Sequence, residues 1–263
     1  MTSKSTIEEQ TLAAAAVDKH LFVYIYSPIM SSGCERELDD EQYEGCLCID
    51  KECSSNCSCV ARFGRNYDSS HCLILNKLNP IFECNSECNC DVEKCSNRLT
   101  QQDSSYKFES DMEIFAVEGK GYGVRCQKAI DIEGTFIGLY LGEILTINEA
   151  KQRSTAANYE HNYLLLYTEH NLIESKTYID ARHYGNWTRF INHSCDPNLE
   201  LVPIRIDNNL PCIAFFTSRP ISANEELSYS YGFQHDDQHD KSFKKCLCSS
   251  VKCKGFLPFL ADI

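Results

Sequence analysis

The chain has 263 residues, 43% of them hydrophobic, which is enough for one sizeable core with a smaller module attached. Its formal net charge of −13 argues against direct nucleic-acid binding, which normally needs a basic patch. An acidic surface suits a basic partner such as a Lys/Arg-rich peptide, although solubility alone explains it equally well. We expect no secretory signal, and the apolar stretch at 21–29 is too short to span a bilayer.

The N-terminal third contains little regular structure in our prediction. Residues 1–20 are expected to be weakly ordered apart from a short alanine-rich helix. Residues 21–29, rich in β-branched and aromatic side chains, are predicted to form a strand, and an acidic, solvated run follows at 35–44. The segment 46–95 holds ten of the 17 cysteines and few periodic apolar positions. Something other than a hydrophobic core must therefore hold it together.

Beyond Met112 the sequence changes to short strand-like runs separated by Gly, Asn, Asp and Pro. The predicted strands are 114–117, 136–145, 163–167, 177–179, 199–206, 213–217 and 227–231. One helix is predicted from Thr146, where Glu149 completes a T-x-x-E capping box, to about Ala156. A polar, flexible loop is expected at 235–245. The pattern predicts a mainly β fold of several small sheets.

The clustered cysteines follow two related patterns with repeated Cys-x-Cys pairs. These are Cys46-x-Cys48-x4-Cys53-x3-Cys57-x-Cys59 and Cys84-x3-Cys88-x-Cys90-x4-Cys95. In a reducing compartment such clusters usually bind metal, and thiolates favour tetrahedral zinc. Three zinc ions need twelve ligand positions, which nine thiolates fill if three of them bridge two metals each. Disulfides or separate zinc fingers are the alternatives, although an odd number of cysteines fits disulfides poorly.

A third group, Cys246-x-Cys248-x4-Cys253, supplies three ligands and leaves one tetrahedral position for a distant residue. Cys72 breaks the spacing of the first clusters and is expected to be a free buried cysteine. Core packing is the expected role of the isolated cysteines Cys34, Cys126 and Cys212.

Four polar and aromatic motifs stand in order along the second half of the chain. They are Gly121-Tyr122-Gly123, Tyr140-Leu141-Gly142-Glu143, Arg-Phe-Ile-Asn-His-Ser-Cys-Asp-Pro-Asn at 189–198, and Glu-Glu-Leu-Ser-Tyr-Ser-Tyr at 225–231. Alone, an Asn-His pair is compatible with an ordinary turn. Together with the cysteine clusters, over about 44–257, the motifs resemble the SET-domain lysine methyltransferases of the suppressor-of-variegation class, with their pre-SET and post-SET modules. Segments 66–68, 203–207 and 256–259 are similar to the methyltransferase half of the vertebrate methyltransferase–transposase fusions.

The resemblance implies a knot-like active site, in which the C-terminal part of the domain threads the Asn-His-Ser-Cys segment. It implies an S-adenosylmethionine site formed by Gly121, Tyr122, Gly123, Tyr163, Arg189, Asn192 and His193. The family usually has Trp where Tyr122 stands, but the cofactor contact there is mostly backbone, so binding should survive. The resemblance also makes Cys195 the fourth ligand of a post-SET zinc ion.

Methyl transfer needs a neutral lysine amine, whereas a free lysine with a pKa of ~10.4 is protonated at neutral pH. Desolvation in a narrow aromatic channel and the nearby sulfonium charge lower that pKa. By resemblance, Tyr231 lies at the reacting centre, and Tyr140, Tyr229 and Phe190 are candidate channel walls. Glu226 is expected to orient backbone or peptide rather than to act as a base. Ordinary sheet packing is the alternative role of the tyrosines.

We therefore expect an N-terminal segment at 1–30, a pre-SET zinc cluster at 31–97, a SET domain at 98–234 and a post-SET module at 235–263. The expected activity is methylation of a histone H3 tail in the nucleus, on chromosomes, without a nucleic-acid or membrane partner. The class favours lysine 9, and the fusion-like segments leave lysine 36 open. Because many relatives carry Phe where Tyr229 stands, mainly mono- and dimethylation is expected.

Three alternatives to a histone methyltransferase remain. The enzyme could methylate a lysine of a non-histone protein. An inactive SET fold could bind chromatin as a scaffold, although the Asn192-His193 pair and Tyr231 argue against inactivity. A zinc-based DNA-binding module is disfavoured by the acidic charge.

Overall fold

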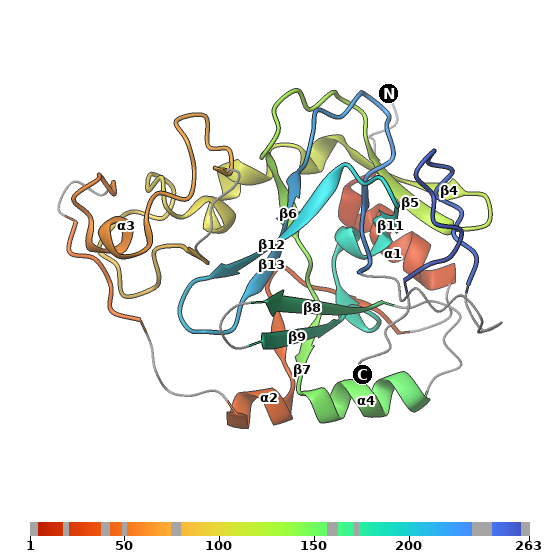
Figure 1. The fold of residues 1–263 in the computed structure, drawn as a ribbon, viewed down its shortest axis with the longest axis horizontal. Helices are drawn as coiled ribbons and strands as arrows, with labels where there is room; N and C mark the ends of the chain where they lie inside the picture. Colours follow the sequence, from red (N-terminus) through yellow and green to blue (C-terminus); the bar gives the residue numbers. More distant parts are fainter. Residues whose placement is uncertain are drawn as a thin grey trace.

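The structure, a computed structural model, describes residues 5–17, 21–37, 43–48, 52–74, 80–156, 163–170, 174–232 and 244–258. Small sheets dominate these residues, and the cysteine-rich segment with α3 lies to one side of them (Figure 1). The helices are α1 (Ile7–Val17), α2 (Ser32–Glu37), α3 (Ser58–Phe63) and α4 (Ile147–Ala156). Short 3-10 helices are η1 (Leu99–Gln101), η2 (Asp103–Tyr106), η3 (Glu109–Asp111) and η4 (Trp187–Phe190). The predicted mainly β fold is confirmed.

The first four-stranded sheet joins the cysteine-rich segment to the main core. Its order is β3 (Ile81–Phe82), β12 (Leu199–Arg205), β13 (Cys212–Thr217) and β6 (Phe136–Leu139). Strand β3 comes from the cysteine-rich segment and pairs in parallel with β12. Next to it, the buried carboxylate of Glu83 accepts hydrogen bonds from Tyr67, Thr100 and Gln101 at 2.7–2.9 Å. Backbone pairing and a satisfied buried carboxylate therefore dock the two parts.

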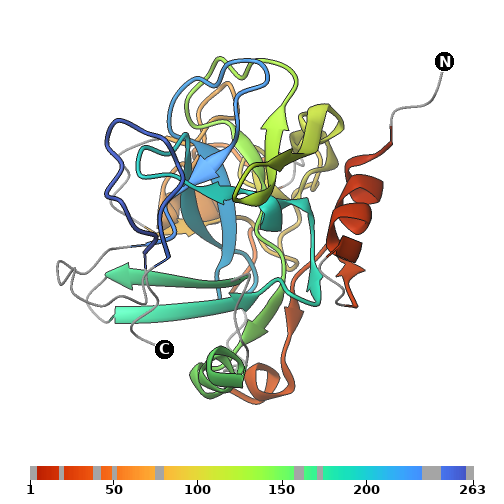
Figure 2. The same cartoon turned by 90° about the vertical axis from the view of Figure 1, so that its right-hand side faces the viewer.

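The second four-stranded sheet has the order β2 (Ile29–Met30), β7 (Glu143–Leu145), β9 (Glu174–Asp180) and β8 (Leu164–His170). Helices α2 and α4 lie side by side beneath it (Figure 2). The predicted capping box opens α4, because Glu149 N–H donates to Thr146 Oγ1 at 3.3 Å and Thr146 N–H donates to Glu149 Oε2 at 2.9 Å. The same carboxylate oxygen accepts from Ser31 Oγ at 2.6 Å, which ties the start of α2 to α4.

Helix α1 corrects the expectation of a weakly ordered N-terminal segment. It is an eleven-residue helix opened by a T-x-x-E capping box between Thr6 and Glu9. Its buried face joins the core through Ile7, Ala14 and Ala15. The local propensity of the alanine run is supported by this packing, which single-sequence patterns do not reveal.

Two predicted strands are shorter than expected. The stretch 21–29 contains β1 (Val23–Tyr24), which pairs with β10 (Tyr184–Gly185), and the beginning of β2, with a bend between them. The stretch 136–145 divides into β6 and β7 near Gly142, where an added Cβ would lie 2.7 Å from the carbonyl oxygen of Asp180. The chain passes from the first sheet to the second at this point. Only glycine, which has no side chain, lets the backbone of residue 142 come so close to that of Asp180. Most of the loop expected at 235–245 lies outside the described residues.

Two small pairings assemble the C-terminal half. Strands β4 (Met112–Val117) and β5 (Gly121–Cys126) form an antiparallel hairpin. Strands β11 (Asn192–His193) and β14 (Ser228–Tyr229) are parallel, with Asn192 opposite Ser228 and His193 opposite Tyr229. The Asn-His segment is thus held against the chain that follows it by about 35 residues, as expected for the knot-like site.

Candidate active site and metal centres

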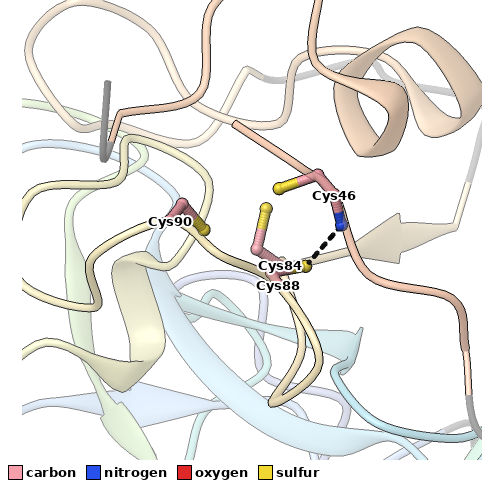
Figure 3. Close-up of side chains that lie close together, drawn as sticks. All are labelled: Cys46, Cys84, Cys88 and Cys90. Carbon is pink, nitrogen blue, oxygen red and sulfur yellow. Dashed lines mark hydrogen bonds between the residues drawn. The ribbon is translucent and has the colours of Figure 1, made fainter. Parts of the chain in front are cut away.

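Nine cysteines of the first two patterns gather in one buried cluster. Within it, three groups of four sulfurs have all members within 4.8 Å of one another: Cys46/Cys84/Cys88/Cys90, Cys46/Cys53/Cys57/Cys84 and Cys53/Cys84/Cys90/Cys95. Figure 3 shows the sulfurs of Cys46 and Cys90 pointing toward that of Cys84. The remaining two, Cys48 and Cys59, lie 3.8 Å and 3.7 Å from Cys53 and Cys88.

These spacings fit shared metal ligands. Sulfurs bound tetrahedrally at about 2.3 Å from zinc lie roughly 3.8 Å apart, and neighbouring sulfurs of the cluster are 3.6–3.9 Å apart. All described cysteines are free thiols, so the disulfide alternative is not realised. Because Cys84 belongs to all three groups, the arrangement calls for bridging sulfurs rather than separate fingers.

Hydrogen-bond donors surround the same sulfurs. Cys46 N–H lies 3.3 Å from Cys88 Sγ (dashed in Figure 3), and Asn97 Nδ2 lies 3.5 Å from Cys84 Sγ. The buried Arg98 guanidinium donates to Cys90 Sγ at 3.2 Å. Nine thiolates outweigh the charge of three divalent ions, so a loaded cluster is anionic and such donors stabilise it. The residues present therefore fit a thiolate–zinc cluster.

The third cysteine group meets its distant partner. The sulfurs of Cys195, Cys246, Cys248 and Cys253 all lie within 4.8 Å of one another. Backbone N–H groups of Lys254 and Gly255 donate to the sulfurs of Cys195 and Cys253, both at 3.4 Å. Four convergent thiols with no fifth ligand side chain in the group match a closed structural zinc site.

The C-terminal segment also contacts the β4–β5 turn. A Cβ added to Gly119 would lie 2.8 Å from the side chain of Leu247. The side chain of Phe256 in this segment is 41% exposed.

Tyr231 is fixed at both its backbone and its hydroxyl. Its N–H donates to His193 Nδ1 at 3.1 Å, and its hydroxyl donates to the carbonyl oxygen of Ile191 at 3.1 Å. Because Nδ1 accepts, the proton of a neutral His193 sits on Nε2, which lies 3.4 Å from Cys195 Sγ. Burial, aided by the Lys254 ammonium, lowers the pKa of His193 to about 4, so the ring is neutral near pH 7.

The expected channel walls surround Tyr231 in part. The Tyr229 ring lies 4.8 Å from that of Tyr231 and 5.1 Å from that of Phe215. Tyr140 is buried, and its hydroxyl donates to the carbonyl oxygen of Tyr163 at 2.8 Å. Burial raises the pKa of the hydroxyls of Tyr140, Tyr229 and Tyr231 above the ordinary value of a tyrosine, so all three are protonated at neutral pH.

The residues assigned to the cofactor lie around β5 and η4. Gly121, Tyr122 and Gly123 open β5, and the Tyr122 carbonyl oxygen accepts from Asn192 Nδ2 at 2.9 Å. The ring of Phe190, which is expected to be a channel wall, lies 5.9 Å from that of Tyr122.

Arg189 is a buried support of the same region. Its guanidinium carbon lies 3.6 Å, 4.6 Å and 4.8 Å from the ring centroids of Tyr163, Phe22 and Phe190, respectively. Its Nε donates to the carbonyl oxygen of Ala181 at 2.9 Å. The guanidinium thus makes cation–π contacts with three rings, and Arg189 supports the aromatic side chains around it.

One residue of the site was missed in the sequence. Lys120, directly before Gly121, pairs with Glu226, whose carboxylate also accepts from Asn192. Its position beside the glycine motif was the available signal, but its partner is 106 residues away.

Comparisons with known proteins identify this architecture. The family model described as "SET domain" matches residues 121–232, and that described as "Pre-SET motif" matches residues 5–98. Similar curated proteins are human SETMAR, at 34% identity over 90% of this chain, and bovine SETMAR, at 33% over 90%. Su(var)3-9 of Drosophila melanogaster is 36% identical over 90% of the chain. All three are named histone-lysine N-methyltransferases. The chain spans 36% of the human, 82% of the bovine and 39% of the fly protein.

Solved structures agree. The methyltransferase domain of human SETMAR matches with a TM-score of 0.74 and 32% identity, covering 91% of this chain and 90% of that one. Arabidopsis thaliana SUVH6 in complex with SAM matches at 0.74 and 29%, covering 90% and 50%. KRYPTONITE in complex with DNA, an H3(1–15) peptide and SAH matches at 0.70 and 26%, covering 90% and 47%.

The chain is therefore a protein with pre-SET and SET regions. It belongs to the family of SET-domain histone-lysine N-methyltransferases. It is an S-adenosylmethionine-dependent protein-lysine N-methyltransferase. The expected similarity to the suppressor-of-variegation class is confirmed by Su(var)3-9, and the second expected similarity is confirmed by SETMAR. The KRYPTONITE complex contains DNA, so the expectation that no nucleic acid binds is not supported. Within the described residues, no helix is long and apolar enough to cross a membrane.

Proposed function

We propose that the chain methylates lysine 9 of the histone H3 tail, mainly to the mono- and dimethyl states, in the nucleus on chromosomes. The observation that supports an active enzyme is the β11–β14 pairing, in which Asn192-His193 lies beside Tyr229 and Tyr231. Hydrogen bonds to His193 and Ile191 fix the backbone and hydroxyl of Tyr231. Such positioning is expected of a catalytic residue and favours an enzyme over an inactive scaffold.

The proposed cofactor site consists of the β5 glycine motif, Tyr163, Arg189, Asn192 and His193. Bound S-adenosylmethionine supplies an electrophilic methyl group on a sulfonium. The side chains of this protein hold the cofactor in place. Two hydrogen bonds orient Asn192, and the Arg189 guanidinium packs against the Tyr163 ring. Holding the amine and methyl group in attack geometry lowers the barrier by up to ~7–11 kcal/mol.

At the lysine, the tyrosines act as neutral dipoles rather than as bases. Their raised pKa values keep Tyr140, Tyr229 and Tyr231 protonated, so none of them removes the amine proton at neutral pH. The buried site instead disfavours the ammonium form, and the proton leaves to solvent before transfer. Tyr231 then orients the neutral amine, while Tyr140 and Tyr229 form buried walls of the lysine channel.

The choice of substrate is supported by relatives and by charge. The KRYPTONITE structure holds an H3(1–15) peptide, which includes position 9 and ends before position 36. The net charge of −13 favours the approach of a basic tail. The similarity to SETMAR leaves a second candidate open, which is lysine 36 of H3 or a non-histone lysine.

A panel of H3 peptides decides between these targets. Peptides covering residues 1–15 and 27–45, each with its target lysine intact or replaced by alanine, are incubated with the protein and S-adenosylmethionine, and products are read by mass spectrometry. We expect methylation of the first peptide that disappears when lysine 9 is replaced. Methylation of only the second peptide would move the assignment to lysine 36, and methylation of neither, with cofactor bound, would favour a non-histone substrate.

We also propose four zinc ions, three in the nine-cysteine cluster and one at Cys195, Cys246, Cys248 and Cys253. The sulfur spacings and the donors around them support this count.

A further inference from the structure

The side chain of Asn192 uses both of its amide hydrogens inside the protein. Its Nδ2 atom lies 2.9 Å from the carbonyl oxygen of Tyr122 and 2.9 Å from Oε1 of Glu226. Both partners are acceptors, so only the NH2 end of the amide can face them. In the part of the chain that the structure describes, no group donates to Asn192 Oδ1. That oxygen is left as an acceptor for a bound molecule.

Glu226 is held in turn by Lys120. The ammonium lies 2.8 Å and 2.7 Å from the two carboxylate oxygens, and the Lys120 and Glu226 side chains are only 16% and 27% exposed. The Glu226 backbone forms a bridge with Arg125 of β5. The ion pair fixes the Glu226 carboxylate and the bridge fixes its backbone. The carboxylate is therefore held in the orientation in which it accepts a hydrogen bond from Asn192.

The second glycine of the Gly121-Tyr122-Gly123 motif makes room for this arrangement. A Cβ atom on Gly123 would lie 2.9 Å from Glu226 Oε1 and 3.1 Å from Asn192 Nδ2. Any side chain at this position would push the carboxylate and the amide away from β5. The motif therefore serves the approach of Asn192 and Glu226 as well as that of the cofactor.

We propose that Glu226, held by Lys120, is a positioning residue that orients the Asn192 amide so that its carbonyl oxygen accepts a hydrogen bond from S-adenosylmethionine. The inference rests on the proposed cofactor site. The donor is an N–H or O–H group of the cofactor, either the ammonium of its amino-acid half or a group of its nucleoside half. An amide turned the other way would present N–H to the same donor and repel it.

The variant Glu226→Leu tests this orientation. Oε1 of Glu226 accepts from both Lys120 and Asn192, and leucine offers no acceptor in its place, so only the Tyr122 carbonyl oxygen is left to hold the NH2 end of the Asn192 amide. We expect S-adenosylhomocysteine to bind about tenfold more weakly in isothermal titration calorimetry, the loss expected for one hydrogen bond. With 5′-methylthioadenosine as a second probe, a loss for S-adenosylhomocysteine alone assigns the donor to the amino-acid half. A loss for both probes assigns it to the nucleoside half, and unchanged affinity for both overturns the proposal.

A charge swap separates orientation from mere stabilisation. The double variant Lys120→Glu with Glu226→Lys restores an ion pair but offers Asn192 no acceptor. We expect its thermal unfolding to recover toward that of the natural protein while its affinity for S-adenosylhomocysteine stays low. Recovery of affinity would show that the pair only stabilises the fold. Glu225→Gln, at a neighbouring carboxylate paired with Arg219, is the matched control and should bind normally. If the natural protein bound neither probe, the cofactor site itself would be wrong.

Discussion

A single hydroxyl group at Tyr229 sets the room available around the lysine amine in our interpretation. The ring is buried between Tyr231 and Phe215. Its hydroxyl occupies space and can hold a water molecule that a third methyl group would have to displace. We predict that Tyr229→Phe shifts products from mono- and dimethyl toward trimethyl lysine, with little change in the first transfer. A penalty of about 1.4 kcal/mol already slows a step tenfold. Time courses by mass spectrometry test this. Rapid trimethylation by the natural protein, or identical products from the variant, would contradict it.

The same tyrosines predict how the rate depends on pH. Burial raises the pKa values of Tyr140, Tyr229 and Tyr231, so their hydroxyls stay protonated as the pH rises through the ordinary value of 10.0. The substrate lysine, in contrast, loses its proton with a pKa of ~10.4 in free solution. We therefore expect kcat/KM to rise with pH from 7 to about 10, without a falling limb from tyrosine ionisation. Initial rates under saturating cofactor measure this profile, and a decline between pH 8 and 9 in a protein that remains folded would argue against protonated tyrosines.

At the scale of single elements, Glu149 connects the beginnings of α2 and α4. Partial burial raises its pKa, but hydrogen bonds from Ser31 and Thr146 outweigh this effect and lower it to about 2. A lowered carboxylate pKa stabilises the fold above the ordinary value of 4.5, and this stabilisation is lost as the pH falls toward 2. We predict that Glu149→Gln lowers the free energy of unfolding at pH 7 by about 1 kcal/mol. The difference should shrink between pH 4.5 and 2, as followed by urea denaturation. Glu133→Gln, in an exposed loop, is the control.

The C-terminal segment is an element that the proposed zinc site, rather than a hydrophobic core, would hold in place. Its proposed ligands join it to Cys195, which lies two residues after His193, and His193 accepts from the Tyr231 backbone. We predict that Cys248→Ser abolishes methyl transfer while the thermal unfolding of the main core changes little, because the segment no longer closes over the site. The buried Cys72, outside every cluster, supplies the control Cys72→Ser, which should stay active. Full activity of Cys248→Ser would remove this zinc ion from the mechanism.

Across the chain, the elements that the sequence predicts are those marked by patterns within a few neighbouring residues. The capping box at Thr146 and the alternating runs beyond Met112 predicted α4 and most strands, because these patterns act over a few residues. The same capping signal at Thr6 does not by itself predict an ordered helix, because an alanine-rich segment has no amphipathic pattern to show that it packs on a core. The pair of Lys120 and Glu226 was not predictable from spacing, because the fold alone joins residues so far apart.

The cysteine clusters lie in the pre-SET segment and at the C-terminal segment, and their metal content gives the final prediction. The cysteine-rich segment pairs with the first sheet through β3 and packs on it through Tyr67, Leu73 and Ile81. Around the nine cysteines, its interior consists of sulfur atoms rather than apolar side chains. Metal binding there would contribute folding free energy, because the nine ligands are gathered in one place only when the segment is folded. We predict four zinc ions per chain by elemental analysis of purified protein, and three in Cys248→Ser. Chelation should first release the less buried post-SET zinc, with loss of activity. It should then unfold the pre-SET segment, seen as new proteolytic cleavage within 52–98 while the sheets stay protected. One or two zinc ions in the natural protein would refute the shared-thiolate cluster, and simultaneous loss of all protection on chelation would show that the sheets depend on the same metals.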